Sequence, residues 1–314
     1  MRAVRNTERG IEVLDVASPE SPDGLVRVRV RSAGICGSDL HLIEWGPLPV
    51  TLGHEFAGVL DDGTEVAVQP QTPCDVCDCC LRGDPHLCRE ILSRTHGVSI
   101  DGGLADEVWV DPRAVIALPG GVRLGDAGLV EPLAVAVHGI DIAEVSPGMR
   151  VLVIGAGSIG LCAVAAGAVT GADVDLAARY PHQIEAGEKV GAGTALGTDY
   201  DVVIEAAGSQ SAIDQAVNLA RPGGTIVAMA TYWSPIEIGL GFTTKELQLR
   251  ATSGYGVHRH SGVRDFVAAA DLLARVPEVV DALVTHRFGL DDAKEAFRVA
   301  GDRSSGAIKV QLIP

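Results

Sequence analysis

The sequence predicts an α/β protein in two parts, a β-rich part followed by a parallel sheet covered by helices. Its 314 residues are more than one ordinary domain needs and fit two. The first 130 or so residues contain short strand-like runs broken by Gly, Pro and Asp. From about Glu131 onwards, apolar strand-like runs alternate with helical segments, which is typical of a parallel sheet with both faces covered.

The individual elements follow from hydrophobic periodicity. In the β-rich part, apolar and polar residues alternate with period two at 25–30, 65–68 and 105–110. In the second part we expect strands at 151–154, 174–177, 202–204 and 225–230, with helices after Gly160, near 182–190 and after Ser211. The last 55 or so residues return to a mixture, with helices through 266–273 and 293–300 and a closing strand at 308–313.

Composition and charge exclude several classes of partner. The formal net charge of −16 would repel a nucleic-acid backbone or an anionic membrane. Residues 151–172 carry no charge and are long enough to span a bilayer, but five glycines within them favour a strand, a turn and a helix in a protein core. The N-terminus lacks the apolar core of a signal peptide, so we expect a cytoplasmic protein in a reducing compartment.

Four of the seven cysteines have the spacing of a structural zinc site. Cys74, Cys77, Cys80 and Cys88 form the pattern C-x2-C-x2-C-x7-C. Four thiolates on a turning loop can surround Zn²⁺ tetrahedrally and leave no position open, so we expect a structural zinc rather than four unrelated buried thiols. Cys79 and Cys162 lie outside the spacing and are expected to take no part.

A second set of metal-ligating residue types lies outside this cluster. Cys36 stands in G-I-C-G-S-D-L-H, His54 and Glu55 in G-H-E, and Glu131 in E-P-L. Taken singly, each has an ordinary explanation as a buried or surface side chain. Together they supply sulfur, nitrogen and oxygen ligands, a combination that suits zinc with one coordination position free.

A glycine-rich motif indicates a dinucleotide site. The motif G-A-G-S-I-G at 155–160 follows an apolar strand and opens a helix, which is the context that supports a G-x-G-x-x-G match. Glycines permit the turn and the close approach of a pyrophosphate to the helix N-terminus. The residues expected to bind the cofactor here are Gly155, Gly157, Ser158, Ile159 and Gly160.

The end of the next strand favours NADP(H) over NAD(H). An acidic residue at this position would hold the adenosine ribose hydroxyls and repel a 2′-phosphate. Ala178 occupies the position instead and leaves room, while Arg179, followed by Tyr180, can bind the phosphate with two hydrogen bonds. Asp175 is the rival but lies inside the strand, and a solvated surface charge is the alternative role for Arg179.

These motifs, in this order, resemble the zinc-containing medium-chain dehydrogenase/reductase family, which includes alcohol, sorbitol and threonine dehydrogenases. The matching stretches are G-I-C-G-S-D-x-H, G-H-E-x-A-G, the four-cysteine lobe, V-E-P-L-x-x-x-x-H, G-x-G-x-x-G and T-H-R-F at 285–288. The resemblance implies a GroES-like catalytic domain at 1–134 and 258–314 around a Rossmann domain at 135–257. It also implies one catalytic and one structural zinc ion.

The resemblance assigns roles to particular residues. Cys36, His54 and Glu131 would hold the catalytic zinc, and Glu55 would be an exchangeable fourth ligand that competes with water. Ser38 would accept the proton of an alcohol and His41 would relay it to solvent. Asp39 would orient a ligand histidine from behind.

The implied activity is that of a zinc-dependent alcohol dehydrogenase or carbonyl reductase that uses NADP(H). The alternatives are a zinc-independent quinone or enoyl reductase, and a catalytically silent NADPH-binding or zinc-storing protein. Relatives form homodimers or homotetramers through the last cofactor-domain strands, here expected at 235–240. Sorbitol-type enzymes carry an Arg-Tyr pair where this chain has Gly254-Tyr255, which counts against a polyol substrate.

The chain departs from the family pattern between Val190 and Asp201. Only about ten residues separate the helix ending near Val190 from the strand at 201–205. Relatives fit a further strand and helix here, but a parallel crossover needs a dozen or more residues. We therefore expect an edge strand and its helix to be deleted, leaving about five parallel strands and an open wall beside the adenine.

Overall fold

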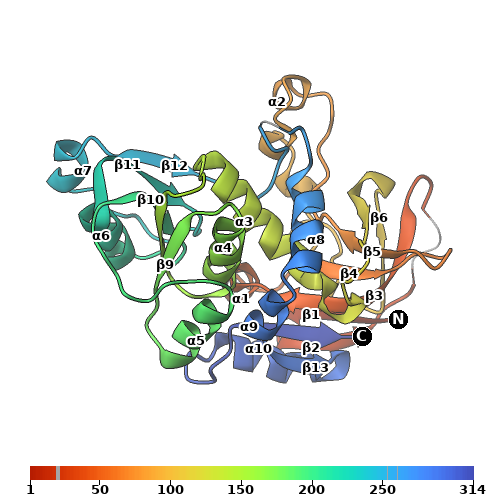
Figure 1. Cartoon of the computed structure of the whole chain (residues 1–314). Coiled ribbons are helices and arrows are strands. Elements are labelled where there is room, and N and C mark those ends of the chain that lie inside the picture. Colours follow the sequence, from red (N-terminus) through yellow and green to blue (C-terminus); the bar gives the residue numbers. More distant parts are fainter. Residues whose placement is uncertain (19–21, 253, 260) are drawn as a thin grey trace. The chain divides into compact units, whose positions relative to one another are not determined.

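The chain forms two compact units. The structure is a computed structural model that describes residues 1–18, 22–252, 254–259 and 261–314. The first unit comprises Met1–Glu131, Leu273–Arg275 and Val284–Pro314, and the second comprises Pro132–Leu272 and Val276–Leu283 (Figure 1).

The first unit is built on a seven-stranded sheet. Its path runs β13-β14-β3-β4-β5-β7, and β6 also pairs with β3. Apolar side chains that alternate along these strands fill a core that includes Val28, Phe56 and Leu104. The strands are β3 (Val26–Ile35), β4 (Glu55–Val59), β5 (Glu65–Val68), β6 (Glu107–Val110), β7 (Val115–Ala117), β13 (Val284–Gly289) and β14 (Lys309–Ile313). Around them lie the hairpin β1 (Arg2–Thr7) and β2 (Gly10–Asp15), and helices α1 (Gly37–Glu44), α2 (Asp78–Leu81) and α10 (Ala293–Gly301).

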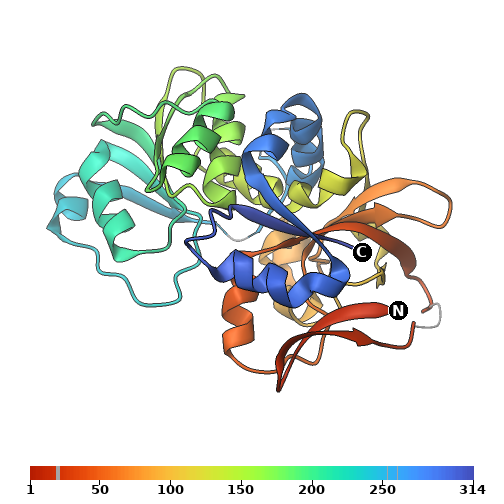
Figure 2. The same cartoon turned by 90° about the horizontal axis from the view of Figure 1, so that it is seen from below.

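The C-terminal segment completes the sheet of the first unit. Strand β14 pairs antiparallel with β3, with Val310 opposite Ile35, and β13 lies parallel to β14 (Figure 2). The expected GroES-like domain, made from the N-terminal half and the C-terminal segment, is therefore confirmed.

The second unit contains the parallel sheet. Its order is β12-β11-β10-β8-β9, and every neighbouring pair is parallel (Figure 1). The strands are β8 (Arg150–Ile154), β9 (Asp173–Ala177), β10 (Tyr200–Glu205), β11 (Ala220–Ala228) and β12 (Gln248–Ala251). The helices are α3 (Val130–Ile142), α4 (Ser158–Ala168), α5 (Pro181–Lys189), α6 (Gln210–Leu219), α7 (Leu240–Thr244), α8 (Asp265–Arg275) and α9 (Glu278–Leu283).

The deleted edge strand is confirmed. Within the described residues the parallel sheet has five strands, and β9 forms its edge. A single residue remains where another strand would pair: the N–H of Gly193 donates to Val174 O at 2.8 Å and Gly193 O accepts from Leu176 N at 2.9 Å. From this bridge the chain continues to β10.

The structure differs from the expected domain boundary at 258. Residues 258–272 and 276–283 belong to the second unit instead of the first. The physical reason is that α9 packs on α4 and α5, and that buried Asp265 at the start of α8 accepts a hydrogen bond from His138 Nδ1 of α3 at 2.7 Å.

Two further expectations need correction. Residues 235–239 form no strand, and Leu240 begins helix α7, so the last strand of this sheet is β12. Tyr255 is 3% exposed and packs edge-on against Phe266 with ring centroids 5.2 Å apart, so it belongs to the core of the second unit. None of the described helices is both long enough and apolar enough to cross a membrane.

Candidate metal centres and dinucleotide site

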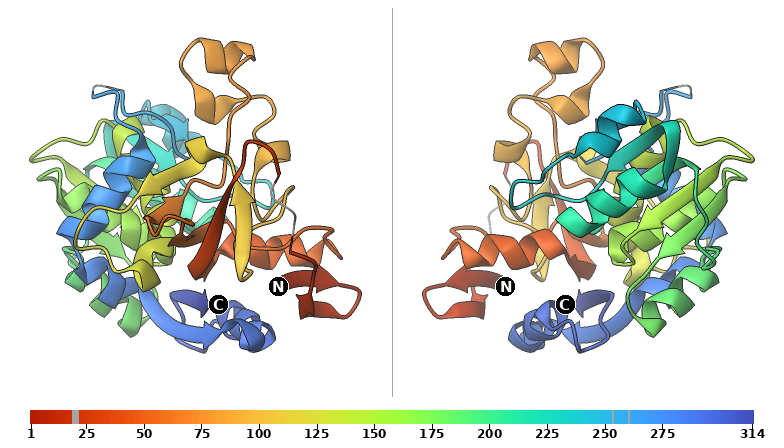
Figure 3. Two further views of the ribbon diagram at one scale, coloured as in Figure 1. Left: turned by 90° about the vertical axis from the view of Figure 1, so that its right-hand side faces the viewer. Right: turned by 90° about the vertical axis from the view of Figure 1, so that its left-hand side faces the viewer.

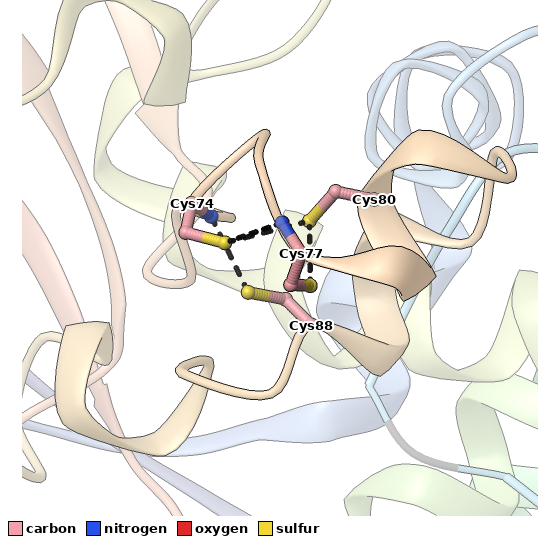
Figure 4. Close-up of side chains that lie close together, drawn as sticks. All are labelled: Cys74, Cys77, Cys80 and Cys88. Carbon is pink, nitrogen blue, oxygen red and sulfur yellow. Dashed lines mark hydrogen bonds between the residues drawn. The ribbon is translucent and has the colours of Figure 1, made fainter.

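The four-cysteine lobe brings all four thiols together. It projects from the sheet of the first unit (Figure 3), and the sulfur atoms of Cys74, Cys77, Cys80 and Cys88 lie within 4.8 Å of one another (Figure 4). The Cys77 and Cys80 sulfurs are 3.5 Å apart, and those of Cys74 and Cys80 are 4.0 Å apart. Tetrahedral Zn–S bonds of about 2.3 Å place sulfurs about 3.8 Å apart, so the donor set fits zinc.

Backbone N–H groups point at these sulfurs. Cys74 N lies 3.3 Å from Cys88 Sγ, and Cys77 N lies 3.4 Å from Cys74 Sγ. Hydrogen bonds from the backbone of Arg89 and Cys80 lower the pKa of the Cys77 thiol to about 6. This lowering favours the thiolate form of Cys77, the form that binds a metal.

Cys79 and Cys162 take no part in the four-thiol group, as expected. Cys79 is 8% exposed, and its thiol lies within 4.8 Å of ligand atoms of Cys77 and Asp78. It is not part of the group formed by Cys74, Cys77, Cys80 and Cys88. Cys162 is buried within α4 in the second unit.

A mixed group of possible metal ligands forms where β3 ends and β4 begins. Cys36 follows β3 and is the N-cap of α1, while Glu55 is the first residue of β4 and His54 directly precedes it. Because β3 and β4 pair antiparallel, with Gly34 opposite Glu55, their ends meet. One ligand atom each of Cys36, His54 and Glu55 lies within 4.8 Å of the others.

Asp39 holds this group from behind. Its carboxylate is fully buried, with Oδ2 accepting the N–H of Cys36 at 2.9 Å and Oδ1 lying 3.4 Å from His54 Nδ1. This leaves His54 Nε2 as the ring atom that can face a metal. Burial lowers the pKa of His54, but the Asp39 carboxylate and the Cys36 sulfur outweigh burial and hold the pKa well above its usual range.

The hydroxyl of Ser38 lies beside the same ring. Ser38 Oγ is 3.2 Å from His54 Nε2, within hydrogen-bond distance. His41 lies one turn further along α1, with 43% of its side chain exposed and Nδ1 3.7 Å from Glu44 Oε2. Residues three apart on a helix share a face, so Ser38 and His41 lie on one side of α1.

Glu131 lies outside this group of three. Among the described residues, the ligand atoms that come within 4.8 Å belong to Cys36, His54 and Glu55. Glu131, in the first turn of α3, is 8% exposed, and burial raises its pKa to about 7, with opposing effects from the charges of His54 and Lys309. Glu131 is therefore a buried carboxyl that interacts electrostatically with His54 and Lys309, without joining the group of Cys36, His54 and Glu55.

Lys309 contacts this group, and the sequence did not point to it. Its Nζ donates to both carboxylate oxygens of Glu55, each at 2.7 Å, and to Ile35 O at 3.1 Å. The Lys309 and Glu55 side chains are 2% and 1% exposed. Burial lowers the pKa of Lys309, but the Glu55 carboxylate outweighs burial and raises the pKa above its usual range, which favours the ammonium form of Lys309. A lone lysine in a closing strand carries no motif, and only the pairing of β14 with β3 reveals the contact.

The glycine-rich motif forms a strand–turn–helix in the second unit. Gly155 follows β8 with a φ of +103°, and its N–H donates to Ala177 O at 3.0 Å. Gly157 is the N-cap of α4, whose first two residues are Ser158 and Ile159. The helix packs so closely on the turn that a side chain at Gly160 would collide with Gly155 O, so this position requires glycine.

The start of α4 fits a pyrophosphate. No side chain caps this helix in the described structure, so the N–H groups of its first turn can bind an anion. A Cβ added to Gly157 would meet nothing within 4 Å, which leaves space for a ligand to approach the backbone.

The end of β9 separates Asp175 from Arg179. Asp175 lies in the middle of β9 and its Oδ2 accepts a hydrogen bond from Tyr200 at 2.7 Å. Arg179 follows the strand by two residues and is exposed, and Tyr180 stacks on His182 with centroids 5.7 Å apart. The acid is therefore engaged within the sheet, while the arginine is free to meet a ligand.

Comparisons with known proteins agree with this arrangement. Residues 22–120 match the profile of the alcohol dehydrogenase GroES-like domain, and residues 126–312 match the glucose dehydrogenase C-terminus. D-xylulose reductase A of Aspergillus oryzae is 33% identical over an alignment 311 residues long. The alignment covers 87% of this chain and 85% of the relative.

Two solved structures share the whole fold. A protein assigned as a zinc-binding dehydrogenase from Sinorhizobium meliloti 1021, solved with NADP bound, is 29% identical with a TM-score of 0.87. An alcohol dehydrogenase from Escherichia coli CFT073, complexed with NADH, is 27% identical with a TM-score of 0.89. Each match covers 100% of this chain and 99% of the other. With both profiles, the relative and the fold in agreement, the chain belongs to the zinc-containing medium-chain dehydrogenase/reductase family.

Proposed function

We propose that the chain is a zinc-dependent dehydrogenase that moves a hydride between NADP(H) and the carbinol or carbonyl carbon of a polyhydroxylated substrate. The observation that carries the proposal is the group of Cys36, His54 and Glu55, with ligand atoms within 4.8 Å, beside the Ser38 hydroxyl. The relative named for D-xylulose supports a polyhydroxylated ketone or alcohol as the substrate. The similarity to this relative outweighs the missing Arg-Tyr pair, which had counted against a polyol substrate.

The ligands we propose for the catalytic zinc are Cys36, His54 and Glu131, with Glu55 exchanging for water. Glu55 is held at both oxygens by Lys309, which favours Glu131 as the permanent ligand and keeps Glu55 in reserve. A zinc ion bound by these residues would supply Lewis-acid polarisation of the substrate oxygen, and a bound nicotinamide would supply the hydride chemistry.

The chain's own residues manage the proton. Ser38 accepts the proton of the substrate hydroxyl, and His41, half exposed on the next turn of α1, delivers it to solvent. Asp39 fixes the orientation of the His54 ring from the Nδ1 side, so that Nε2 stays directed at the metal.

The NADP(H) preference rests on Ala178 and Arg179. With Asp175 hydrogen-bonded to Tyr200, no acid at the end of β9 opposes a 2′-phosphate. Arg179→Asp should lower the preference for NADPH over NADH by roughly 10- to 100-fold, the range of a charge-assisted hydrogen bond. The measurement is the ratio of kcat/KM for the two cofactors. Lys189→Asp, the same charge change at an exposed position of α5, is the control and should leave the ratio unchanged.

The decisive test of the function combines metal analysis with a substrate panel. We expect two zinc ions per chain and NADPH-dependent reduction of D-xylulose or related ketoses and aldehydes. One zinc per chain together with reduction of quinones or enones would identify a zinc-independent reductase. NADPH binding without turnover on any substrate would identify a silent binding protein. We also propose a homodimer or homotetramer, which light scattering will check.

A further inference from the structure

A buried carboxylate stands at the carboxyl end of a central strand in the parallel sheet. Glu205 is the last residue of β10 and is fully buried. Its Oε1 accepts the N–H groups of Ala207 and Gly208, both at 2.8 Å. Its Oε2 accepts the hydroxyl of Tyr232, which lies beyond the end of β11.

Glu205 thereby ties together the segments that follow two neighbouring strands. The 206–208 segment leads from β10 to α6, and the 229–232 segment follows β11. The main-chain oxygen of Glu205 also links the two segments, because it accepts hydrogen bonds from Met229 N at 2.9 Å and Ala230 N at 3.1 Å.

The tied segment also touches the glycine turn. A Cβ added to Gly155 would lie 2.9 Å from Ala207 N and 3.0 Å from Ala206 C, so the two backbones are in direct contact. Three segments therefore meet at the carboxyl ends of β8, β10 and β11, which neighbour one another in the sheet. In open parallel sheets, ligands bind outside these ends.

The Tyr232 hydroxyl remains a permanent donor in this contact. Burial and the adjoining Glu205 carboxylate raise the pKa of Tyr232 far above its usual value. The protonated hydroxyl, the form that donates to Glu205, is therefore favoured.

We propose that Glu205, together with Tyr232, is a positioning residue for the dinucleotide. The pair fixes the 206–208 segment against the glycine turn and so shapes the surface that receives the cofactor. Neither side chain needs to touch the cofactor, since the effect is transmitted through the loop backbone. The inference rests on the proposed dehydrogenase function and deepens it.

The same sheet supplies a matched control. Tyr200, at the start of β10, donates to Asp175 Oδ2 at 2.7 Å and accepts Gly197 N at 2.8 Å. This is also a tyrosine–carboxylate hydrogen bond in the second unit, but Tyr200 stands at the amino end of the strand that Glu205 closes. Tyr200→Phe and Tyr232→Phe each remove one hydroxyl from such a pair.

The experiment measures the dissociation constants of NADPH and NADP⁺ by calorimetry for the wild type, Tyr232→Phe and Tyr200→Phe, with melting temperatures of each. We expect Tyr232→Phe to weaken cofactor binding by about fivefold or more, while Tyr200→Phe changes it by less than about twofold. Glu205→Gln keeps the side-chain size and should weaken binding in the same direction. The KM for the carbonyl substrate, at saturating cofactor, should stay unchanged in Tyr232→Phe.

Two results would overturn the inference. One is unchanged cofactor affinity in both Tyr232→Phe and Glu205→Gln. The other is an equal loss of affinity in Tyr200→Phe, which would mark a general loss of stability. If the wild type binds neither NADPH nor NADH, the proposed function itself fails, and that outcome is separate from both.

Discussion

The two candidate metal centres of the first unit differ in what surrounds their ligands. In the four-cysteine lobe, all four donors are sulfur, and the backbone N–H groups of Cys74 and Cys77 point at two of the sulfurs. Around Cys36 and His54 the neighbours are side chains that donate or accept hydrogen bonds: Asp39, Ser38 and the Glu55–Lys309 pair.

The difference separates a structural centre from a reactive one. Four thiolates complete the coordination of a zinc ion and leave it no vacancy for a substrate. A mixed donor set with a hydroxyl and buried acids close by can bind an oxygen substrate and move its proton. The two centres therefore differ both in their ligand types and in the hydrogen-bonding side chains beside the ligands.

Replacing Cys36 should give the largest loss of activity and so tests whether the two centres have separate roles. Cys36→Ser removes a metal ligand of the mixed centre without touching the lobe. We expect turnover to fall by more than about 100-fold, beyond what loss of an outer-sphere partner causes, with one zinc ion lost per chain. Circular dichroism should show the fold retained, and global unfolding would contradict the separation of the two centres. Cys79→Ser, a cysteine outside the four-thiol group, is the control and should keep full activity.

Removing the cation of the Glu55–Lys309 pair should lower the free energy of unfolding. Lys309→Met leaves a buried Glu55 carboxylate without its cation, which should destabilise the protein by about 3–5 kcal/mol. Denaturant unfolding measures this loss. The double variant Lys309→Met/Glu55→Gln removes the unpaired charge and should regain most of the stability. A double variant no more stable than Lys309→Met would show that the ion pair is not what the lysine contributes.

Opening the lobe tests its structural role and should have the smallest effect on chemistry. Cys88→Ser removes one of four sulfurs and should cost about 3 kcal/mol of folding free energy, or roughly 6–12 °C in Tm for a chain of this size. Below the new Tm, kcat should stay within about twofold of the wild type. A loss of kcat with an unchanged Tm would reverse the roles assigned to the two centres.

The sequence predicted the features that depend on short-range spacing. The four cysteines and the glycine turn lie in local motifs, so their positions could be inferred from spacing. The mixed set was predicted, from the family resemblance, as Cys36, His54 and Glu131 with Glu55 in exchange, whereas the structure groups Cys36, His54 and Glu55. The five-stranded sheet was also predictable, because about ten residues cannot hold a strand and a helix.

Features that depend on distant contacts were not predictable in this way. Lys309 reaches Glu55 across 254 residues, and no motif surrounds it. Helix α8 was recognisable from its periodicity, but periodicity does not say which core a helix joins, and all but its last three residues belong to the second unit. Helix α9 was not predicted. Glu205 gave no signal either, because its partners are backbone N–H groups and a tyrosine beyond the next strand.

The position of β14 in the chain has a consequence for biosynthesis. The strand that closes the sheet of the first unit, and carries the cation of Glu55, leaves the ribosome long after β3 and β4. During translation the nascent first unit therefore has an unpaired β3 edge and an uncompensated acid in its interior. The second unit, whose strands all lie between these pieces, can fold earlier. The Glu55–Lys309 pair can thus form only after the strands of the second unit have been made, and a ribosome stalled before Lys309 yields a chain in which Glu55 lacks its cation.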